Sequence, residues 1–469
     1  MKSELIAKFV AIVGEKHVIR DKALLASYLV EPRELYNGCA FLVLRPSMIS
    51  EVSAIMQLAT ATGTPIVPQG GNTGLVGGQQ PDRTGKQVIV SLSRLNRIRS
   101  IDTVGKVALV EAGVVLKNLQ KRVEEEGCLF PLSLSSEGTA QLGGILSSNA
   151  GGTSVLSYGN ARELCLGIEV VLPDGRILED LRRVKKDNSG YDLKNIFIGA
   201  EGTLGIITAA AVKLFPSPSS RAVAYAGIDS VIKALRLFQF FENSLGPMLT
   251  GFEVMSRLGL EFSLSYRDHS RDPFIETYPW YVLINIDSFY EHQTAKLVIE
   301  DLLSEALDKG FVCNAVVAES KMQEEAFWQL RDNISLAQKL VGASIKHDIS
   351  VPLSEIPDFL REAEQIVGDL LPGAQIVVFG HLGDGNLHYN ISQPAVLDKK
   401  VFLARREEVN HRIHSLSMAY GGAFSAEHGI GQMKRCELLC FKSSVAIELM
   451  RGLKKLYDPL NIMNPGKIF

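Results

Sequence analysis

Short apolar runs and one amphipathic segment alternate along the first part of the chain. Residues 41–45, 65–68 and 88–91 are apolar runs of strand length. Between the first two runs, apolar residues recur at helical spacing over residues 49–59. This order predicts a βαβ unit at the start of an N-terminal domain.

The pattern changes after the stretch Pro216-Ser217-Pro218-Ser219-Ser220, where we place a domain boundary. Beyond it, strand-length apolar runs alternate with long segments of helical periodicity. The expected strands are 221–228, 280–287 and 313–317, and the expected helices are 230–244, 292–310 and 321–341. This alternation predicts an α+β domain, an antiparallel sheet with helices on one face. The predicted domains are residues 1–218 and 219–469.

Composition narrows the class of protein. The chain has 469 residues, of which 46% are hydrophobic and 22% charged, as in ordinary globular proteins. Its net charge of −3, without a sustained basic block, gives no support for nucleic-acid binding. No apolar run reaches the length of a membrane span, and six cysteines without a CxxC pair indicate reduced thiols. We therefore expect a cytoplasmic protein without stable membrane insertion.

Glycines are concentrated between Gln69 and Gly78, with five of them in nine residues. Glycine lets the backbone approach a ligand, and several N–H groups pointing one way can bind a pyrophosphate. No helical pattern follows, so this is not the Rossmann dinucleotide fingerprint. A tight turn between strands is the alternative, but the density of glycines favours a binding loop. A second tract of small residues, 131–152, suits further cofactor contacts or a helix packed closely on a sheet.

Candidate metal chemistry is found in the stretch 379–390. Its Gly383-Asp384-Gly385 predicts a turn, which places His381 and His388 on the two arms of a hairpin. Paired Cβ atoms on neighbouring strands lie about 5 Å apart, close enough for two imidazoles to bind one ion. Glu427 is a third candidate, because two histidines and one carboxylate form a catalytic zinc set. Two core histidines and an unrelated acidic residue explain this spacing equally well.

Four segments, taken in order, resemble one known family: 70–74, 186–193, 198–208 and 380–390. The family is the flavoproteins of the vanillyl-alcohol oxidase type with the FAD-linked oxidase C-terminal domain. The resemblance implies an N-terminal FAD-binding domain of two subdomains and a C-terminal α+β cap domain, built on an antiparallel sheet, over the isoalloxazine ring. The segment 421–469 would return to the flavin.

The resemblance implies FAD as the cofactor. Members with covalent FAD carry a His within the first glycine tract, whereas this chain has Asn72-Thr73, so non-covalent FAD is expected. The residues expected to contact FAD are Gly70, Gly71, Asn72, Thr73, Gly74, Gly77, Gly78, Gly138, Thr139, Gly143, Gly144, Asn149, Gly202, Ile206 and Asn464.

The resemblance also implies a divalent metal, usually Zn²⁺, with the ligands His381, His388 and Glu427. His428 corresponds to the general base, and an imidazole that titrates near neutrality suits removal of an alcohol proton. The residues expected to bind substrate are Arg331, Ser335, Lys346, Asn390 and His428.

The activity implied is oxidation of a small D-2-hydroxyacid to the 2-oxoacid. Arg331 and Ser335 are four residues apart in a predicted helix and share a face. With Lys346 they would hold the distal carboxylate of D-2-hydroxyglutarate, with D-malate as a second candidate. Family members that prefer 2-hydroxyglutarate often have Thr where Ser335 stands, which leaves fine specificity open.

Other activities and partners remain open at this stage. D-Lactate or glycolate oxidation within the same family is the alternative activity. A zinc hydrolase is a remote alternative, and it predicts a colourless protein. An electron-transfer flavoprotein is the electron acceptor that the resemblance suggests, and the oligomeric state, including a homodimer, is undetermined.

Overall fold

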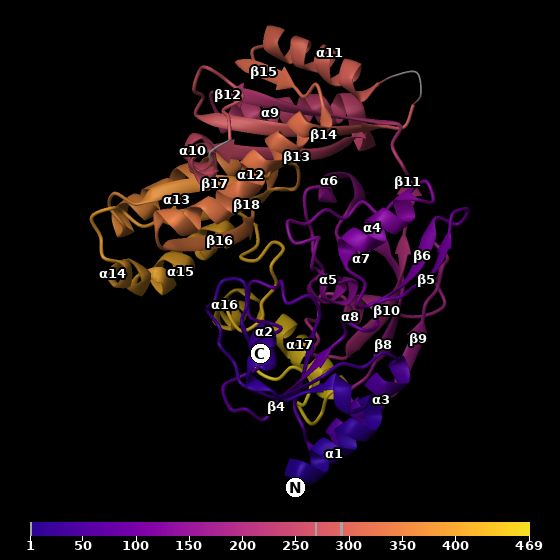
Figure 1. Ribbon diagram of the computed structural model, residues 1–469. Helices are drawn as coiled ribbons and strands as arrows, with labels where there is room; N and C mark the ends of the chain where they lie inside the picture. The colour runs from indigo at the N-terminus through magenta and orange to yellow at the C-terminus, as the bar shows by residue number, and fades with distance from the viewer. Residues whose placement is uncertain (1, 268–269, 291–293) are drawn as a thin grey trace. The chain divides into compact units, whose positions relative to one another are not determined.

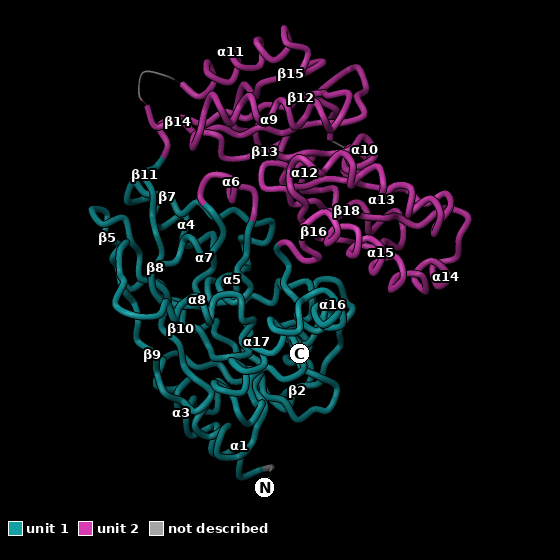
Figure 2. Tube along the Cα trace, turned by 180° about the vertical axis from the view of Figure 1, so that it is seen from behind, with its two compact units in different colours: residues 1–151, 159–217, 427–469 teal, residues 152–158, 218–426 magenta. Residues whose placement is uncertain are grey.

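The computed structural model describes residues 2–267, 270–290 and 294–469, which divide into two compact units. The first unit consists of Met1–Gly151, Gly159–Ser217 and Glu427–Phe469, and the second consists of Gly152–Tyr158 and Pro218–Ala426 (Figure 2). The last segment of the chain therefore packs with the N-terminal part, although nearly all of the second unit lies between them in sequence.

The first unit contains the predicted βαβ arrangement. Its four-stranded sheet has the order β1–β2–β4–β3, formed by Val18–Ile19, Ala40–Leu44, Gln87–Ser91 and Ile66–Gln69. β2 and β3 both run parallel to β4. Helix α3 (Ile49–Thr62) buries the apolar stripe that the sequence predicts, and it shares a core with α1 (Lys2–Val13).

A second sheet of the first unit is antiparallel. Its five strands have the order β5–β6–β10–β8–β9, formed by Ile98–Asp102, Val107–Glu111, Ile206–Lys213, Cys165–Val171 and Ile177–Asp180. A separate short pair consists of β11 (Phe215–Pro216) and β7 (Cys128–Leu129). Further helices of this unit are α2 (Lys22–Leu29), α4 (Leu116–Glu124), α5 (Leu142–Ser148), α7 (Ala161–Leu164), α8 (Lys194–Phe197), α16 (Arg435–Phe441) and α17 (Ser444–Tyr457) (Figure 1).

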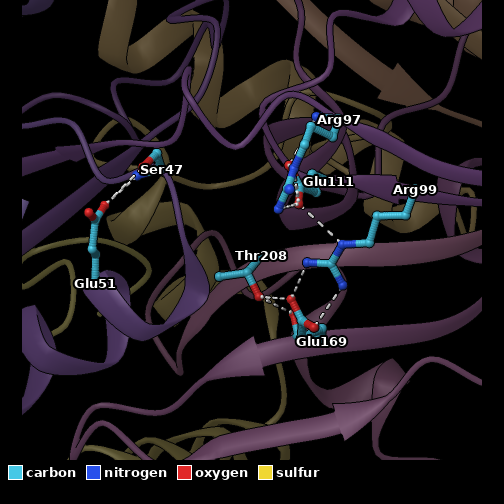
Figure 3. Close-up of polar contacts among 7 residues, drawn as sticks. All are labelled: Ser47, Glu51, Arg97, Arg99, Glu111, Glu169 and Thr208. Carbon is cyan, nitrogen blue, oxygen red and sulfur yellow. Dashed lines mark hydrogen bonds and ion pairs between the residues drawn. The ribbon is translucent and has the colours of Figure 1, made fainter.

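Ion pairs connect strands β5, β6 and β8 of the five-stranded sheet (Figure 3). Buried Glu111 accepts hydrogen bonds from Arg97 at 3.0 Å and from Arg99 at 3.2 Å. Arg99 also binds both carboxylate oxygens of Glu169, at 2.9 and 3.0 Å, and Thr208 donates to Glu169 at 2.8 Å. Burial opposes ionisation of Glu111, but the hydrogen bonds from Arg97 and Arg99 outweigh it and lower its pKa. Both carboxylates bind arginine, so this network stabilises the sheet.

The second unit is built on a seven-stranded sheet in which every neighbouring pair is antiparallel, as predicted. The order is β15–β12–β14–β13–β17–β18–β16. These strands are Asn314–Val317, Ser220–Ile228, Trp280–Ser288, Leu249–Ser256, Gln375–His381, Asn386–Ser392 and Ser344–Ser350.

Helices cover both faces of this sheet, so the expectation of helices on one face was wrong. Phe252, Val254 and Val378 belong to the core on one face, and Met255 and Phe379, which point the opposite way, belong to the core on the other. The helices packed on the first face are α9 (Val231–Leu245), α11 (Ala295–Asp308), α13 (Ile356–Leu370), α14 (Lys399–Ala404) and α15 (Arg406–Ala419). The helices on the second face are α10 (Arg257–Tyr266) and α12 (Lys321–Val341). An apolar stripe indicates that a helix packs on a sheet, but it does not indicate on which face.

The predicted helix 292–310 corresponds to α11, and its expected start at His292 lies outside the described residues. In the part of the chain that the structure describes, no helix combines the length and the apolar character that crossing a bilayer requires.

Candidate functional site

The hairpin of β17 and β18 positions the two candidate histidines. A single 3-10 turn, Leu382–Asp384, joins the strands and ends at Gly385 with φ +76°. A Cβ at Gly385 would lie 2.3 Å from the carbonyl oxygen of Val351, so this turn requires glycine. His381 ends β17 and His388 lies on β18, with 6.0 Å between the centroids of the two imidazole rings.

Strand pairing places four of the predicted metal and substrate residues on one face of the seven-stranded sheet, and these are Lys346, Asn390, His381 and His388. Directly paired residues project to the same side, and every second residue along a strand joins them. The face is the one that α12 covers, because Val377 and Phe379 pack against that helix. The pairs that share this face are Lys346–Asn390, Asn390–Val377, Asp348–His388, His388–Phe379 and His381–Glu253.

Glu253 is a fully buried carboxylate on this face. It accepts hydrogen bonds from His381 Nδ1 at 2.5 Å and from Arg331 Nε at 2.8 Å. Burial raises the pKa of Glu253, but its interactions with His381 and Arg331 outweigh that effect and lower the pKa to about 2. Ionised Glu253 therefore binds one predicted metal ligand and one predicted substrate residue at the same time.

Apart from His428, the other predicted substrate residues lie on α12 or on strands of the sheet that it covers. Lys346 Nζ donates to the hydroxyl of Ser335 at 3.4 Å and to the carbonyl oxygen of Ser335 at 3.3 Å. Buried Asn390 donates from Nδ2 to Oε1 of Gln338 at 2.8 Å. Arg331 stacks on Phe379, with 5.1 Å between the guanidinium carbon and the ring centroid.

The chain leaves the second unit directly beside Asp348. Ala426, the last residue of that unit, donates its N–H to the carbonyl oxygen of Asp348 at 3.3 Å. Glu427 and His428 follow, and one potential ligand atom from each of Asp348, His388, Glu427 and His428 lies within 4.8 Å of the others. This group contains Asp348, which the sequence did not suggest, and it does not contain His381. His381 stays a predicted ligand.

The segment after His428 is held by Glu201. The Glu201 carboxylate accepts hydrogen bonds from the N–H groups of Ile430 and Gly431, both at 2.7 Å. Burial raises the pKa of Glu201, and the two backbone donors oppose that shift. Gly429 has φ +81°, and a Cβ there would lie 2.9 Å from Glu201 Oε1. Glu201 therefore fixes the backbone immediately after the predicted base.

The donor chemistry of the group fits a divalent metal. Imidazole nitrogen and carboxylate oxygen are ligands that Zn²⁺ binds, and catalytic sites of this type keep a position for substrate. Asp348 also accepts a hydrogen bond from Asn386 Nδ2 at 3.1 Å. Hydrogen bonds of this kind orient a carboxylate for a metal.

Within the first unit, the two tracts of small residues lie against one another and against a third tract, the segment 198–208. A Cβ at Gly71 would lie 2.0 Å from the carbonyl oxygen of Thr139, an approach that only glycine allows. Asn464 donates from Nδ2 to the carbonyl oxygens of Gly78 at 2.9 Å and Glu201 at 2.8 Å. Asn464 thereby ties the first and third tracts to the last segment of the chain.

The first unit fits a large polar cofactor such as FAD. The Oδ1 atom of Asn464 is buried and has no hydrogen-bond partner among the described residues. Gly138 and Gly144 are exposed, and a Cβ on either would meet open space. Glycine backbone open to a ligand and buried acceptors that need a donor are features of pyrophosphate and ring-binding loops.

Three contact residues at the site were missed from the sequence. Asp348 lies two residues after Lys346 on a predicted strand. The alternation of side chains along a strand could therefore have placed both residues on the same face. Gln338 lies three residues after Ser335 on a predicted helix. The helical spacing could therefore have placed these two residues on the same face. No local sequence pattern could have predicted Glu253, because its contact with His381 joins positions 128 residues apart.

Comparisons with known proteins agree with this arrangement. Residues 40–180 match the FAD binding domain family, and residues 217–468 match the family FAD linked oxidases, C-terminal domain. An Arabidopsis thaliana relative named D-2-hydroxyglutarate dehydrogenase, mitochondrial, is 36% identical over 100% of this chain and 82% of its own. A Schizosaccharomyces pombe relative, named provisionally as a mitochondrial D-lactate dehydrogenase, is 35% identical over 95% of this chain and 85% of its own.

The fold is shared with solved flavoenzyme structures. The substrate-bound structure of p-cresol methylhydroxylase has a TM-score of 0.77 and 17% identity, covering 99% of this chain and 96% of that one. A likeness at that identity bears on the fold alone, and it confirms the expected vanillyl-alcohol oxidase type. With both domains matched and full-length relatives above 30% identity, this chain belongs to the family of FAD-linked oxidases that includes the D-2-hydroxyglutarate dehydrogenases.

Proposed function

We propose that this chain is an FAD-dependent dehydrogenase that oxidises D-2-hydroxyglutarate to the 2-oxoacid with the help of a bound divalent metal, preferably zinc. The observation that carries the proposal is the sheet face under α12. There Lys346, Ser335 and Arg331 lie on the same face as the candidate ligands His381 and His388. Two cations and a hydroxyl beside a metal site suit a second substrate carboxylate.

In this proposal each side chain of the site has a separate role. His428 accepts the proton of the 2-hydroxyl on an imidazole nitrogen, a general-base role for which imidazole is suited. Arg331, Lys346 and Ser335 hold the distal carboxylate, and Asn390 orients the substrate. When bound, zinc lowers the pKa of the hydroxyl and FAD accepts the hydride. An electron-transfer flavoprotein is the proposed acceptor of the electrons.

A substrate panel tests the proposed activity. The purified chain, loaded with FAD and zinc, is assayed with D-2-hydroxyglutarate, D-malate, D-lactate and glycolate, using a dye as electron acceptor. We expect the highest kcat/KM with D-2-hydroxyglutarate, because only dicarboxylates use both ends of the site. Equal or better turnover of D-lactate would contradict the proposed substrate.

The two cofactors are tested separately. Purified protein should show a flavin absorption band, and acid precipitation should release the flavin into solution because it is not covalently attached. Colourless active protein would favour a zinc hydrolase instead. Chelation should abolish turnover and zinc should restore it; full activity after metal analysis shows complete removal would refute the metal role.

D-Lactate oxidation is the second candidate function. It is supported by the Schizosaccharomyces pombe relative, whose name refers to that substrate. Ser335 supplies a hydroxyl without the methyl group of Thr, so the distal end of the site is less restricted. The same substrate panel decides between the two acids.

A further inference from the structure

We propose that Glu253 is a positioning residue that couples the metal ligand His381 to the substrate-binding residue Arg331. The inference rests on the proposed function, because it takes the roles of His381 and Arg331 from it. It adds a residue from β13 to a site otherwise built from β16, β17, β18, α12 and the segment that carries Glu427 and His428. Glu253 itself touches neither metal nor substrate in this role.

The hydrogen bond between Glu253 and His381 selects a tautomer. A carboxylate can only accept, so His381 Nδ1 carries the proton at the 2.5 Å contact. In that tautomer Nε2 presents its lone pair, the form in which imidazole binds a metal. Metal-binding histidines commonly donate their second nitrogen to a carboxylate in this way, and the contact strengthens metal binding.

The second oxygen of Glu253 orients Arg331. Glu253 Oε2 accepts from Arg331 Nε at 2.8 Å, and the guanidinium group also lies over Phe379. Because the guanidinium is planar, these two contacts fix the direction of the group. One carboxylate therefore sets the geometry at the metal and at the distal carboxylate of the substrate.

Other buried carboxylates in the chain make a different set of contacts. Glu111 and Glu169 in the first unit bind arginines. Asp287, on the same sheet as Glu253, is buried and accepts from Arg221 at 2.8 Å. Glu253 combines an arginine with an imidazole that lies on the candidate metal face, which is why we assign it to the site.

The experiment compares Glu253→Gln with Asp287→Asn in the full-length protein. Both variants neutralise a buried carboxylate on one sheet, but only Glu253 contacts His381. Zinc dissociation constants are measured on metal-free protein by competition with a coloured chelator, and KM is measured for D-2-hydroxyglutarate and D-lactate. We expect Glu253→Gln to weaken zinc binding by about 10- to 100-fold. Its KM should rise more for the dicarboxylate than for D-lactate, whereas Asp287→Asn should change neither property.

A double variant, Glu253→Met with Arg331→Met, covers the case in which Glu253→Gln fails to fold. Replacing both charges with apolar groups leaves no unpaired charge in the interior. It should fold, yet it should bind zinc as weakly as Glu253→Gln, because His381 has lost its acceptor. Arg331→Met alone should keep near-normal zinc affinity and raise KM for D-2-hydroxyglutarate.

Two results separate this inference from the proposed function. Zinc affinity within about twofold of wild type in Glu253→Gln, or in the folded double variant, would overturn the inference. Wild-type protein that fails to oxidise D-2-hydroxyglutarate, while Glu253→Gln still weakens zinc binding, would refute the substrate and support the positioning role of Glu253 on His381.

Discussion

The two faces of the seven-stranded sheet are built from alternate residues of the same strands, yet they differ in chemistry. On the face toward α9 and α13, β16 and β18 place Ile345, Ile349, Leu387 and Ile391, all buried in an apolar core. On the face toward α12, the intervening positions carry the charged and polar residues Lys346, Asp348, His388 and Asn390.

The difference shows how one strand can serve stability and chemistry at once. Successive side chains of a strand point to opposite faces, so neighbours in sequence belong to separate environments. The apolar face keeps the strands in register, and the polar face then has fixed positions for ligands. Adjacent residues should therefore respond to mutation in opposite ways.

The largest effect should come from a pair of neighbours on β18. We expect His388→Ala to reduce turnover by at least about 10³-fold, because it removes a predicted metal ligand. Its melting temperature without metal should stay close to that of wild type. Leu387→Ala, one residue earlier, should instead lower the free energy of unfolding by about 2–5 kcal/mol, with kcat of the folded protein nearly unchanged.

Chemical denaturation and steady-state kinetics on the two variants measure both quantities. The comparison of faces fails if Leu387→Ala loses turnover while remaining fully folded. It also fails if His388→Ala destabilises the metal-free protein as strongly as Leu387→Ala.

The predicted base gives the next largest effect. His428 lies at the start of the segment that Glu201 holds, outside the apolar core. We expect His428→Gln to lower kcat by about 10²–10⁴-fold, the usual contribution of a general base, with the flavin spectrum unchanged. Stopped-flow reduction of the flavin by substrate measures this step directly. A reduction rate like that of wild type would remove His428 from the role.

Arg331 should show a smaller, substrate-dependent effect. Hydrogen bonds to charged groups contribute about 1.5–3 kcal/mol, so Arg331→Met should raise KM for D-2-hydroxyglutarate by about 10- to 100-fold. The KM for D-lactate, which has no distal carboxylate, should change much less. Lys309→Met is a control for loss of a charge, because this exposed lysine lies at the end of α11, a helix on the other face of the sheet. Equal changes for both acids would contradict the assignment.

The sequence could predict the parts of this site that lie close together along the chain. The glycine turn and the alternation in β18 placed His381 and His388 on a hairpin, and the βαβ unit followed from strand-length runs. Pairing between distant strands was not readable, because hydrophobic alternation sets which side is buried but does not identify a strand's neighbour. Glu253 was not predicted for this reason, since β13 pairs with β17, a strand far away in the sequence. The same limit explains why helices were expected on one face of the sheet only, although α10 and α12 cover the other face.

Ser335 should give the smallest effect and test how finely the polar face is tuned. Ser335→Ala removes a hydroxyl that Lys346 contacts at 3.4 Å, but the carbonyl oxygen of Ser335 at 3.3 Å stays as an acceptor. Lys346 should therefore keep its position, and KM for D-2-hydroxyglutarate should rise by about 2- to 10-fold, the range for one hydrogen bond of typical strength. Ser335→Thr keeps the hydroxyl and adds a methyl group, so its KM should stay near wild type while D-lactate is used less well. A rise in KM as large as that of Arg331→Met would mean that Ser335 holds Lys346 in place, and the polar face would then depend on α12 as much as on the strands.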